Sequence, residues 1–315
     1  MGNVYEIVII GGGPSGLTAG LYAARARMKA LLVEKVLCGG QILVADTIEN
    51  FPGFPDGIKG PELAEWIFKQ AEHAGLESRI AEVKSIALKK GEAGAFGIEL
   101  AEGDELTAAS VIVATGARWN ALNIPGEKEL CGRGVSYCAT CDGPLFRGKD
   151  VVVVGGGDTA LEDAIFLTRF ASSVTVLHRR DKLRATRILQ ERARANKKIH
   201  FQLDSIAVEV KGSAKVEAIE IKDVHSGKIS RLKADGVFVL VGITPNSGLV
   251  SGIVKTDDKG YIITDDEMRT SVDGLFACGD VRKKLLRQVV TAAGDGATAA
   301  FSAEHYVEGL KPAGK

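Results

Sequence analysis

One pattern occurs twice in this chain of 315 residues, and the repeat limits how the chain can fold. The first copy starts at Glu6 and reads EIVIIGGGPSGLTAGLYAARARMKALLVEK. The second starts 144 residues later, at Asp150, and reads DVVVVGGGDTALEDAIFLTRFASSVTVLHRR. In each copy, β-branched residues lead into a glycine turn, about fifteen residues with helical apolar periodicity, and a second apolar strand. The repeat therefore predicts two βαβ units in one chain.

The glycines in the two turns have separate physical roles. Gly11 forms the tight turn, and the bare backbone at Gly13 lets a pyrophosphate approach closely, as Gly157 does in the second copy. The third position, Gly16 or Ala160, must be small so that the helix packs closely on the strand. Free N–H groups at the helix start add donors for phosphate. Two such turns in a strand–turn–helix context predict two dinucleotide sites, rather than turns that bind nothing.

The residues at the end of each second strand distinguish the two sites. Glu34 ends the first repeat, and a carboxylate there suits the 2′-hydroxyl of an unphosphorylated adenosine ribose. The second repeat ends in His178, Arg179 and Arg180, with Arg184 shortly after, and guanidinium groups bind a 2′-phosphate bidentately. We therefore expect NADP(H) at the second site and a dinucleotide without the extra phosphate at the first. The alternative is that the arginines form a solvated basic turn.

A strand-rich stretch follows each βαβ unit. Residues 79–110 and 203–236 contain short alternating runs broken by polar turns, which predicts a β-meander laid on each parallel sheet. Both stretches lead into an apolar strand that ends in glycine, VIVATG at 111–116 and VFVLVG at 237–242. The duplication therefore covers two whole domains.

The C-terminal part of the chain is expected to complete the first domain. GLFACGD at 274–280 predicts an apolar strand, and a long helix of small residues follows it. The predicted fold class is α/β, with two Rossmann-like dinucleotide-binding domains of the three-layer ββα type, the second inserted into the first. The predicted domains are residues 1–117 with 248–315, and residues 118–247. The crossings at 117–121 and 244–248 contain turn-forming residues and make a natural hinge.

Composition excludes several classes of partner. Forty basic residues balance forty acidic ones, so there is no electrostatic case for nucleic acid or an anionic membrane. Residues 7–24 carry no charge, but five glycines and a proline argue against a membrane span. A signal peptide needs a basic start, which residues 1–6 lack. We expect a cytoplasmic protein.

Five cysteines occur, and two of them form the pair in SYCATCDG, Cys138 and Cys141. The odd, sparse count argues against a disulfide framework, and Cys38, Cys131 and Cys278 are interpreted as small buried apolar residues. A CxxC pair is also half of a structural zinc site, which needs four ligands. Cys131 and His178 are the nearest candidates and neither is paired at ligand spacing, so we predict no metal.

At this point the motifs indicate a family. The chain resembles the low-molecular-weight, bacterial-type thioredoxin reductases essentially end to end. The motifs are GGGPSG, GGQI (39–42), ENFPGF (49–54), ATGA (114–117), YCATCDG, GGGDTA, HRRDKLRA, GITPN, and GDV with RQ (287–288). YCATCDG together with HRRD is highly specific, and a cysteine pair inside the insert distinguishes this group from glutathione reductase relatives. Leu286 is a departure, because many members have tyrosine there.

The resemblance implies two cofactors, FAD and NADPH, on separate residues. It also implies a homodimer formed through the FAD domains. FAD would lie on Gly11, Gly13, Ser15, Gly16, Glu34, Lys35, Gly40, Gln41, Asn50, Val83, Thr115, Gly116, Asp280, Val281, Arg287, Gln288 and Val289. NADPH would lie on Gly157, Asp158, Thr159, His178, Arg179, Arg180 and Arg184.

The resemblance also implies the route of the electrons. The Cys138–Cys141 pair would be a redox-active disulfide that is reduced by the flavin and then reduces thioredoxin. Cys138 would attack the partner disulfide, Cys141 would face the flavin, and Asp142 would act as general acid and base. Because the insert carries both the dithiol and the nicotinamide site, it is expected to rotate between the two half-reactions.

Other functions on the same scaffold stay open at this stage. The chain could reduce another small redoxin, take electrons from ferredoxin, or oxidise dithiols with oxygen. Loss of the HRR cations would favour the last two, and those cations are present. The chain could also be a non-catalytic module that binds nucleotides or senses redox state. Such a module would not need intact FAD, NADP and dithiol sites together.

Overall fold

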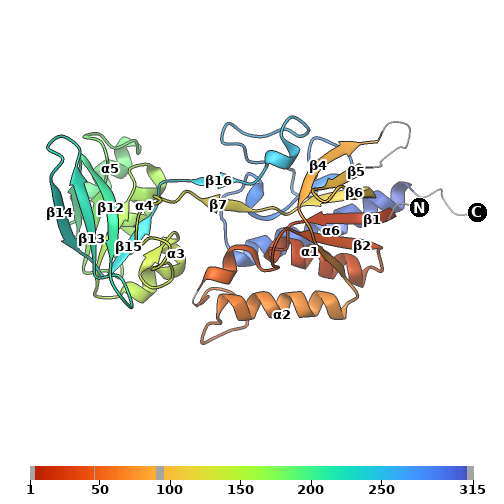
Figure 1. The fold of residues 1–315 in the computed structure, drawn as a ribbon, viewed down its shortest axis with the longest axis horizontal. Coiled ribbons are helices and arrows are strands. Elements are labelled where there is room, and N and C mark those ends of the chain that lie inside the picture. Colours follow the sequence, from red (N-terminus) through yellow and green to blue (C-terminus); the bar gives the residue numbers. More distant parts are fainter. Residues whose placement is uncertain (1–3, 46, 90–95, 311–315) are drawn as a thin grey trace, which may run out of the picture. The chain divides into compact units, whose positions relative to one another are not determined.

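The chain divides into two units, the first of which is formed by two separate segments. A computed structural model describes residues 4–45, 47–89 and 96–310. Unit 1 contains residues 1–118 and 244–315, and unit 2 contains residues 119–243. The crossings are made by β7 (Ala117–Trp119) and β16 (Ile243–Pro245), which pair as a two-stranded sheet (Figure 1).

Unit 1 is built on a seven-stranded sheet with the order β3-β2-β1-β6-β5-β4, in which β17 also pairs with β6. The five strands β3, β2, β1, β6 and β17 run parallel, whereas β5 and β4 continue from β6 as an antiparallel meander. The strands are β1 (Val4–Ile10), β2 (Ala30–Glu34), β3 (Glu77–Ile80), β4 (Val83–Leu88), β5 (Phe96–Leu100), β6 (Glu105–Val113) and β17 (Leu275–Ala277). Runs such as Val8 to Ile10 are buried, as expected for parallel strands covered on both faces.

The two faces of this sheet have different coverings. Alternate residues such as Ile7 and Ile9 pack with the helices, and Val8 and Ile10 pack with the meander residues around Phe96. Figure 1 shows α1 and α2 on the opposite side of β1 from β4 and β5. The helices are α1 (Pro14–Arg25), α2 (Gly60–His73) and α6 (Val289–Leu310), with short 3₁₀ turns η1 (Gly40–Val44), η3 (Gly248–Val250) and η4 (Gly279–Val281). The predicted three-layer arrangement is confirmed.

The long C-terminal helix is present as predicted. α6 has 22 residues and packs on α1, the helix that follows the first glycine turn. A Cβ at Gly296 would collide with the carbonyl oxygen of Ser15, so a glycine is needed where the two helix backbones approach. The last segment of the chain is thereby fixed against the first.

Unit 2 repeats the architecture with five parallel strands in the order β11-β10-β9-β15-β8. Its meander is a separate antiparallel sheet, and Val210, Ile219 and Ile221 of that sheet pack on the parallel strands. The strands are β8 (Val135–Ser136), β9 (Asp150–Val154), β10 (Ser173–Leu177), β11 (Ile199–Gln202), β12 (Ser205–Lys211), β13 (Ala218–Asp223), β14 (Ile229–Lys233) and β15 (Gly236–Val239). The helical elements are α3 (Ala139–Asp142), η2 (Gly143–Phe146), α4 (Asp158–Leu167) and α5 (Arg187–Ala195).

The helices of the two repeats are shorter than predicted. α1 has 12 residues and α4 has 10, where the periodicity suggests about fifteen for each. After α1 the chain turns back at Arg27, which adopts a left-handed φ of 61°. After α4 the hydroxyl of Thr168 donates to the carbonyl of Ile165 at 2.7 Å, a local bond that competes with further helix.

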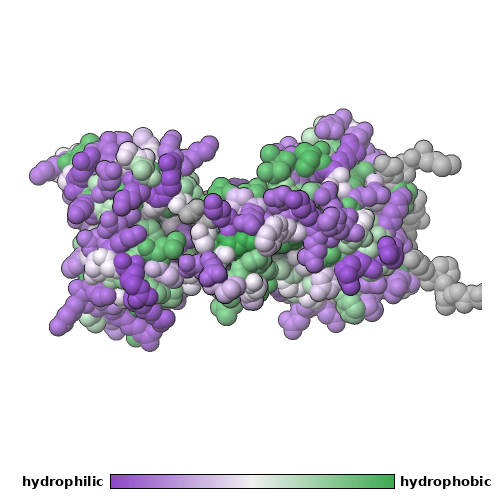
Figure 2. Space-filling model, turned by 90° about the horizontal axis from the view of Figure 1, so that it is seen from below, coloured by the Kyte–Doolittle hydropathy of each residue, from purple (hydrophilic) through white to green (hydrophobic). Residues whose placement is uncertain are grey.

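The described surfaces are mostly polar. Figure 2 shows hydrophilic residues over most of the visible face of each unit, with small hydrophobic patches scattered among these residues. Within the described residues, no helix has both the length and the apolar character that crossing a bilayer requires.

Candidate functional site

The glycine turn of unit 1 has the geometry of a phosphate cradle. Gly11 has a φ of 108°, and a Cβ there would lie 2.5 Å from the carbonyl oxygen of Ala114. A Cβ at Gly16 would collide with the carbonyl of Gly11, which holds α1 close to the turn. In contrast, nothing lies within 4 Å of a Cβ built at Gly13. The turn is therefore closed on its inner side and open at the second glycine, where a pyrophosphate needs access.

A carboxylate lies beside this turn. The backbone N–H of Gly12 donates to Oε2 of Glu34 at 2.7 Å, and that of Val36 donates to Oε1 at 3.1 Å. The neighbouring Lys35 instead pairs with the exposed carboxylate of Glu82 at 2.7 Å, next to Val83 at the start of β4. The predicted residues Glu34, Lys35 and Val83 are thus brought together around the end of β2.

The segment that precedes α2 also reaches the turn. Gly39 donates its N–H to the carbonyl of Gly12 at 2.7 Å, and a Cβ at Gly40 would lie 3.1 Å from the Cα of Gly13. The side-chain amide of Gln41 donates to the carbonyl of Ala117. The structure therefore brings the GGQ segment against the first glycine turn.

The end of β17 forms another wall. Asp280 lies in η4, directly after Gly279. Ser15 of α1 lies against Gly279, since a Cβ built there would be 2.5 Å from the Ser15 hydroxyl. Among the described residues, Oδ1 of Asp280 and Nε of Arg287 are buried without a hydrogen-bond partner. Burial raises the pKa of Asp280, although the cations Lys284 and Arg287 act in the opposite direction. Buried polar atoms are normally hydrogen-bonded, so these two atoms are suited to contact a bound ligand.

The remaining residues predicted for this site lie on neighbouring segments. Val281 is fully buried in η4, and Val289 begins α6. The amide of Asn50 donates to Oε1 of Gln288 at 2.9 Å, which ties the 49–55 loop to the start of α6. Gly116 has a φ of 68° with open space beside it. The hydroxyl of Thr115 is already engaged, since it donates to the carbonyl of Asn246 at 2.7 Å.

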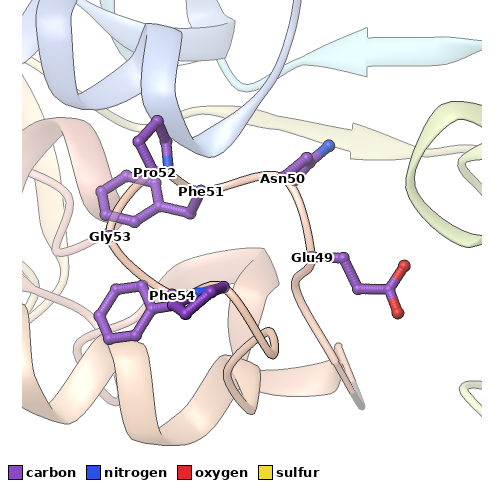
Figure 3. Close-up of a pocket in the computed structure, with 7 residues that line it drawn as sticks. Glu49, Asn50, Phe51, Pro52, Gly53 and Phe54 are labelled. Carbon is purple, nitrogen blue, oxygen red and sulfur yellow. The ribbon is translucent and has the colours of Figure 1, made fainter.

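A cavity of about 450 Å³ lies in the loop that carries Asn50. Figure 3 shows the rings of Phe51 and Phe54 on one side of this loop and the carboxylate of Glu49 on the other. The two phenylalanine rings stack with centroids 6.1 Å apart, and Phe54 also contacts Trp66 of α2 at 5.6 Å. The lining residues are Glu49, Asn50, Phe51, Pro52, Gly53, Phe54 and Pro55.

The glycine turn of unit 2 shows the same division between a closed and an open side. A Cβ at Gly155 would lie 2.7 Å from that of Ala160, whereas nothing lies within 4 Å of a Cβ at Gly157. Asp158 begins α4, and its carboxylate accepts the N–H of Thr186 at 2.7 Å. Thr159 is exposed on the first turn of α4. This turn also leaves bare backbone where a pyrophosphate would approach.

The strand end beside this second turn is cationic. Arg179, Arg180 and Arg184 are exposed, and within the described part of the chain their side chains make no hydrogen bond or ion pair. His178 is 6% exposed and lies against Gly156. Desolvation lowers the pKa of His178, and the nearby guanidinium groups of Arg184, Arg179 and Arg180 add to this effect, although a backbone hydrogen bond with Lys182 opposes it. The net pKa is lowered, so the imidazole is neutral at pH 7. Three unneutralised guanidinium groups are thus free to bind an anion.

The cysteine pair of unit 2 forms a disulfide. Cys138 and Cys141 are joined with their Cα atoms 5.3 Å apart, and both residues are half-buried. Cys138 is the N-cap of α3, where its sulfur accepts the N–H of Cys141 at 3.2 Å. Asp142 follows in the same helical turn. A half-buried disulfide at the start of a helical turn that also contains an aspartate has the residue types that thiol–disulfide exchange requires.

A buried carboxylate fixes the segment before Cys138. Glu127 is 3% exposed and accepts the N–H groups of Leu122 and Asn123 at 2.9 and 2.7 Å. It also accepts the hydroxyl of Tyr137 at 2.9 Å, and Tyr137 stacks on Trp119 with ring centroids 5.5 Å apart. Burial, followed by the contact with Glu127, raises the pKa of Tyr137 well above its usual value. The residue before the disulfide is therefore held from two sides.

The other three cysteines are thiols rather than thiolates. Cys278 is fully buried, but Cys38 and Cys131 are only half-buried, so the interpretation of all three as buried residues was too simple. Burial raises the pKa of Cys38 to about 11 and also raises the pKa values of Cys131 and Cys278. Among the described residues, no three His, Cys, Asp or Glu side chains are grouped as metal ligands.

Sequence reasoning missed several residues that shape these sites. Asn246 lies in the quoted GITPN motif, yet nothing in the pattern predicted that its amide would donate to the carbonyl of Thr115 at 2.9 Å. Glu127 and Asp295 look like ordinary solvated acids in the sequence, but both are buried. The local pattern does not predict their burial. The partners of Asp295 lie 11 to 16 residues before it, whereas those of Glu127 lie only 4 to 10 residues away.

Comparison with known proteins places this arrangement in a family. The model of the pyridine nucleotide-disulphide oxidoreductase family matches residues 5–296. The chain is 46% identical over 310 residues to the thioredoxin reductase of Bacillus subtilis (strain 168). This alignment covers 98% of this chain and 96% of the relative. It is also 46% identical over 307 residues to the thioredoxin reductase of Treponema pallidum (strain Nichols), with 98% of each chain covered.

A solved structure gives the same result. The crystal structure of thioredoxin reductase from Streptococcus pyogenes MGAS5005 is 45% identical, covers 98% of this chain and 100% of its own, and superposes with a TM-score of 0.94. Family members use flavin and a nicotinamide nucleotide in disulfide chemistry. The chain belongs to the pyridine nucleotide-disulphide oxidoreductase family, in its low-molecular-weight thioredoxin reductase group.

Proposed function

We propose that the chain uses NADPH to reduce the disulfide of thioredoxin, through FAD and its own Cys138–Cys141 disulfide. The observation that carries this proposal is the accessible disulfide in a unit with its own nucleotide turn, within a chain that has a second such turn. Neither turn alone is specific. The combination supports transfer of two electrons from a nicotinamide to a protein disulfide.

The residues of unit 1 fit FAD. The open backbone at Gly13 suits a pyrophosphate, and the Glu34 carboxylate suits the ribose hydroxyl of an adenosine without a 2′-phosphate. The orphan oxygen of Asp280 and the orphan Nε of Arg287 supply a hydrogen-bond acceptor and a donor that such a cofactor would satisfy. When bound, FAD supplies the two-electron carrier between the nicotinamide and the disulfide.

The residues of unit 2 fit NADPH. We assign its pyrophosphate to the turn at Gly157 and its 2′-phosphate to Arg179, Arg180 and Arg184, which have no competing partner among the described residues. Neutral His178 lies beneath the turn and adds no charge that would favour one nucleotide over another. Discrimination between NADPH and NADH is therefore assigned to the arginines.

The thiol chemistry is assigned to three residues of one helical turn. Reduction of the disulfide by two electrons and two protons gives the Cys138 and Cys141 thiols. The Cys138 thiolate attacks one sulfur of thioredoxin, whose S–S bond breaks as a mixed disulfide forms. Cys141 then attacks Cys138 Sγ, which releases the thioredoxin dithiol and restores the original disulfide. Asp142 is the proposed acid and base for these proton transfers.

We also propose that unit 2 rotates about the crossings between half-reactions, and that the protein is a cytoplasmic homodimer joined through unit 1. The family resemblance supports both parts. Each crossing is short, and together they form a two-stranded ribbon, so the connection has few residues to reorganise.

Anaerobic mixing of the purified protein with NADPH tests the proposal. Flavin absorbance should bleach with NADPH and more slowly with NADH, and adding oxidised thioredoxin should restore it with formation of thioredoxin thiols. Reoxidation by a different redoxin alone would redirect the assignment of the partner. A protein that carries no flavin, or is reduced only by ferredoxin, would contradict it.

A further inference from the structure

A buried cluster of three charges lies beneath the C-terminal wall of the unit 1 site. Asp295 of α6 pairs with Arg282 at 3.2 Å and with Lys284 at 2.7 Å. The side chains of Asp295, Arg282 and Lys284 are only 11%, 12% and 7% exposed. Buried ion pairs are weak contributors to stability compared with apolar side chains of the same volume, so the cluster calls for another reason.

The carboxylate of the cluster also holds the backbone of η4. Oδ2 of Asp295 accepts the N–H of Gly279 at 3.1 Å, a bond between buried groups. Gly279 has a left-handed φ of 75°, and Ser15 fills the space beside it, so this residue has little freedom to move. Asp295 therefore fixes the residue immediately before Asp280.

The residue after Asp280 is fixed as well. The carbonyl of Val281 accepts the N–H of Ile262 at 3.0 Å, and Arg282 forms a β-bridge with Ile262. Arg282 also donates through Nε to the hydroxyl of Thr264 at 2.8 Å. Asp280 is thus held between two anchored neighbours, while its own Oδ1 is buried and has no hydrogen-bond partner among the residues that the structure describes.

We propose that Asp295 is a positioning residue for the flavin cofactor, because it anchors the Gly279 N–H and so aims the carboxylate of Asp280 at the cofactor. Arg282 and Lys284 pair with the Asp295 carboxylate and orient it. This inference rests on the proposed binding of FAD by unit 1. It assigns no chemical step to Asp295.

Flavin binding by a double-mutant cycle tests the inference. Wild type, Asp295→Ala, Asp280→Ala and the double variant are stripped of flavin and titrated with FAD, with flavin fluorescence as the readout. Each single variant should raise the FAD dissociation constant about tenfold, the effect expected for one hydrogen bond to a charged group. The double variant should be no worse than Asp280→Ala alone, because Asp295 acts through Asp280.

Thermal unfolding of the flavin-free proteins separates positioning from general damage. Asp295→Ala should lower the unfolding midpoint by the same amount in the wild-type protein and in Asp280→Ala. The effects of the two substitutions on stability would then add, whereas their effects on FAD affinity would not. Asp295→Asn keeps an oxygen that can accept from Gly279, and its FAD dissociation constant should stay within about threefold of wild type. This second variant preserves the test if Asp295→Ala does not fold.

A matched control is Glu127→Ala in unit 2, which also removes a buried carboxylate that accepts backbone N–H groups. It should lower the unfolding midpoint and leave the FAD affinity unchanged. Additive losses of affinity in the cycle, or an unchanged affinity in Asp295→Ala, would overturn the inference while leaving the proposed function intact. A wild-type protein that takes up no FAD would overturn both.

Discussion

At the scale of single residues, the two units differ most at the end of their second strand. Glu34 places a carboxylate beside one glycine turn, where it accepts the N–H of Gly12. The equivalent position in unit 2 is His178, which is neutral and buried, and the arginines that follow it point to solvent. Because a carboxylate repels a phosphate and a guanidinium attracts one, we propose that the residues at these two strand ends give the two turns different nucleotide preferences.

Replacing Arg179 and Arg180 with alanine tests that preference. We expect the kcat/KM for NADPH to fall about tenfold to a hundredfold, the range for loss of a hydrogen bond between charged groups, whereas the value for NADH stays nearly constant. Arg192→Ala, which removes an exposed cation from α5, is the matched control. Equal losses for both nucleotides would show that these arginines do not contact the 2′-phosphate.

The paired and unpaired cysteines of unit 2 give a second prediction. Cys138→Ser should retain reduction by NADPH and lose thioredoxin-coupled turnover, because serine cannot form the mixed disulfide. Cys131→Ser should retain both activities, since burial raises the pKa of the Cys131 thiol and keeps it protonated at pH 7. Stopped-flow absorbance and a thioredoxin-coupled assay measure the two steps. Turnover by Cys138→Ser would exclude Cys138 as the attacking thiol.

Residues whose role follows from local pattern could be predicted, and residues whose role depends on distant partners could not. The glycines of both turns show the close contacts and open sides that their spacing predicts. Asp295 lies in AAGDGATAA, which looks like a polar position on a helix, but its partners Gly279 and Lys284 approach it only after β17 joins the sheet. Nothing in the sequence pattern predicts that Asp295 contacts Gly279 and Lys284.

At the scale of elements, helix α4 has a partly buried carboxylic acid, Asp163, next to its apolar face. Ala160, Ala164 and Leu167 of this helix are buried in the core of unit 2, and Asp163 lies at the edge of that face. Burial, together with a smaller contribution from the adjacent Glu162, raises the pKa of Asp163 to about 6. The helix thus contains a carboxylate that resists ionisation in the folded state.

The pH dependence of stability follows from this shift. Between about pH 4 and pH 6 the unfolded chain ionises Asp163 while the folded chain keeps it protonated, so stability falls as pH rises, by at most about 3 kcal/mol. Asp163→Asn should remove this fall and be more stable than the parent protein at pH 7. Urea unfolding from pH 4 to 7 in a Trp66→Phe background, where Trp119 reports on unit 2, measures it. Glu191→Gln, which changes an exposed carboxylate on α5, is the control and should follow the parent protein. If the pH profiles of Asp163→Asn and the parent protein were parallel, Asp163 would not be the group that causes the fall in stability.

The existence and order of the elements could be predicted better than their lengths. Apolar period and glycine turns predicted the parallel strands, both meanders and the long helix α6. The ends of α1 and α4 could not be predicted, because α1 stops where the non-glycine Arg27 adopts a left-handed conformation. After that turn, β2 begins at Ala30, which pairs with Ile7 of β1.

At the scale of the whole molecule, duplication has produced two units with the same layers and different chemistry. The structure divides the chain at 118/119 and 243/244, whereas the sequence pattern predicts boundaries at 117/118 and 247/248. In both versions the chain passes between the units twice, at or next to β7 and β16. Because unit 2 carries both the disulfide and the cationic nucleotide turn, a flavin in unit 1 would have to receive each of them in turn.

The proposed rotation predicts at least two distances between the units in solution. Donor and acceptor dyes on Glu62→Cys in α2 and Lys228→Cys before β14 would report that distance, after Cys38 and Cys131 are changed to serine and with the Cys138–Cys141 disulfide intact during labelling. Single-molecule energy transfer should show two populations whose proportions shift when NADPH is added. A pair within unit 2, Glu191→Cys with Lys228→Cys, should give one unchanged distance. If the pair between units also gives one distance that NADPH does not alter, the two half-reactions occur without rotation.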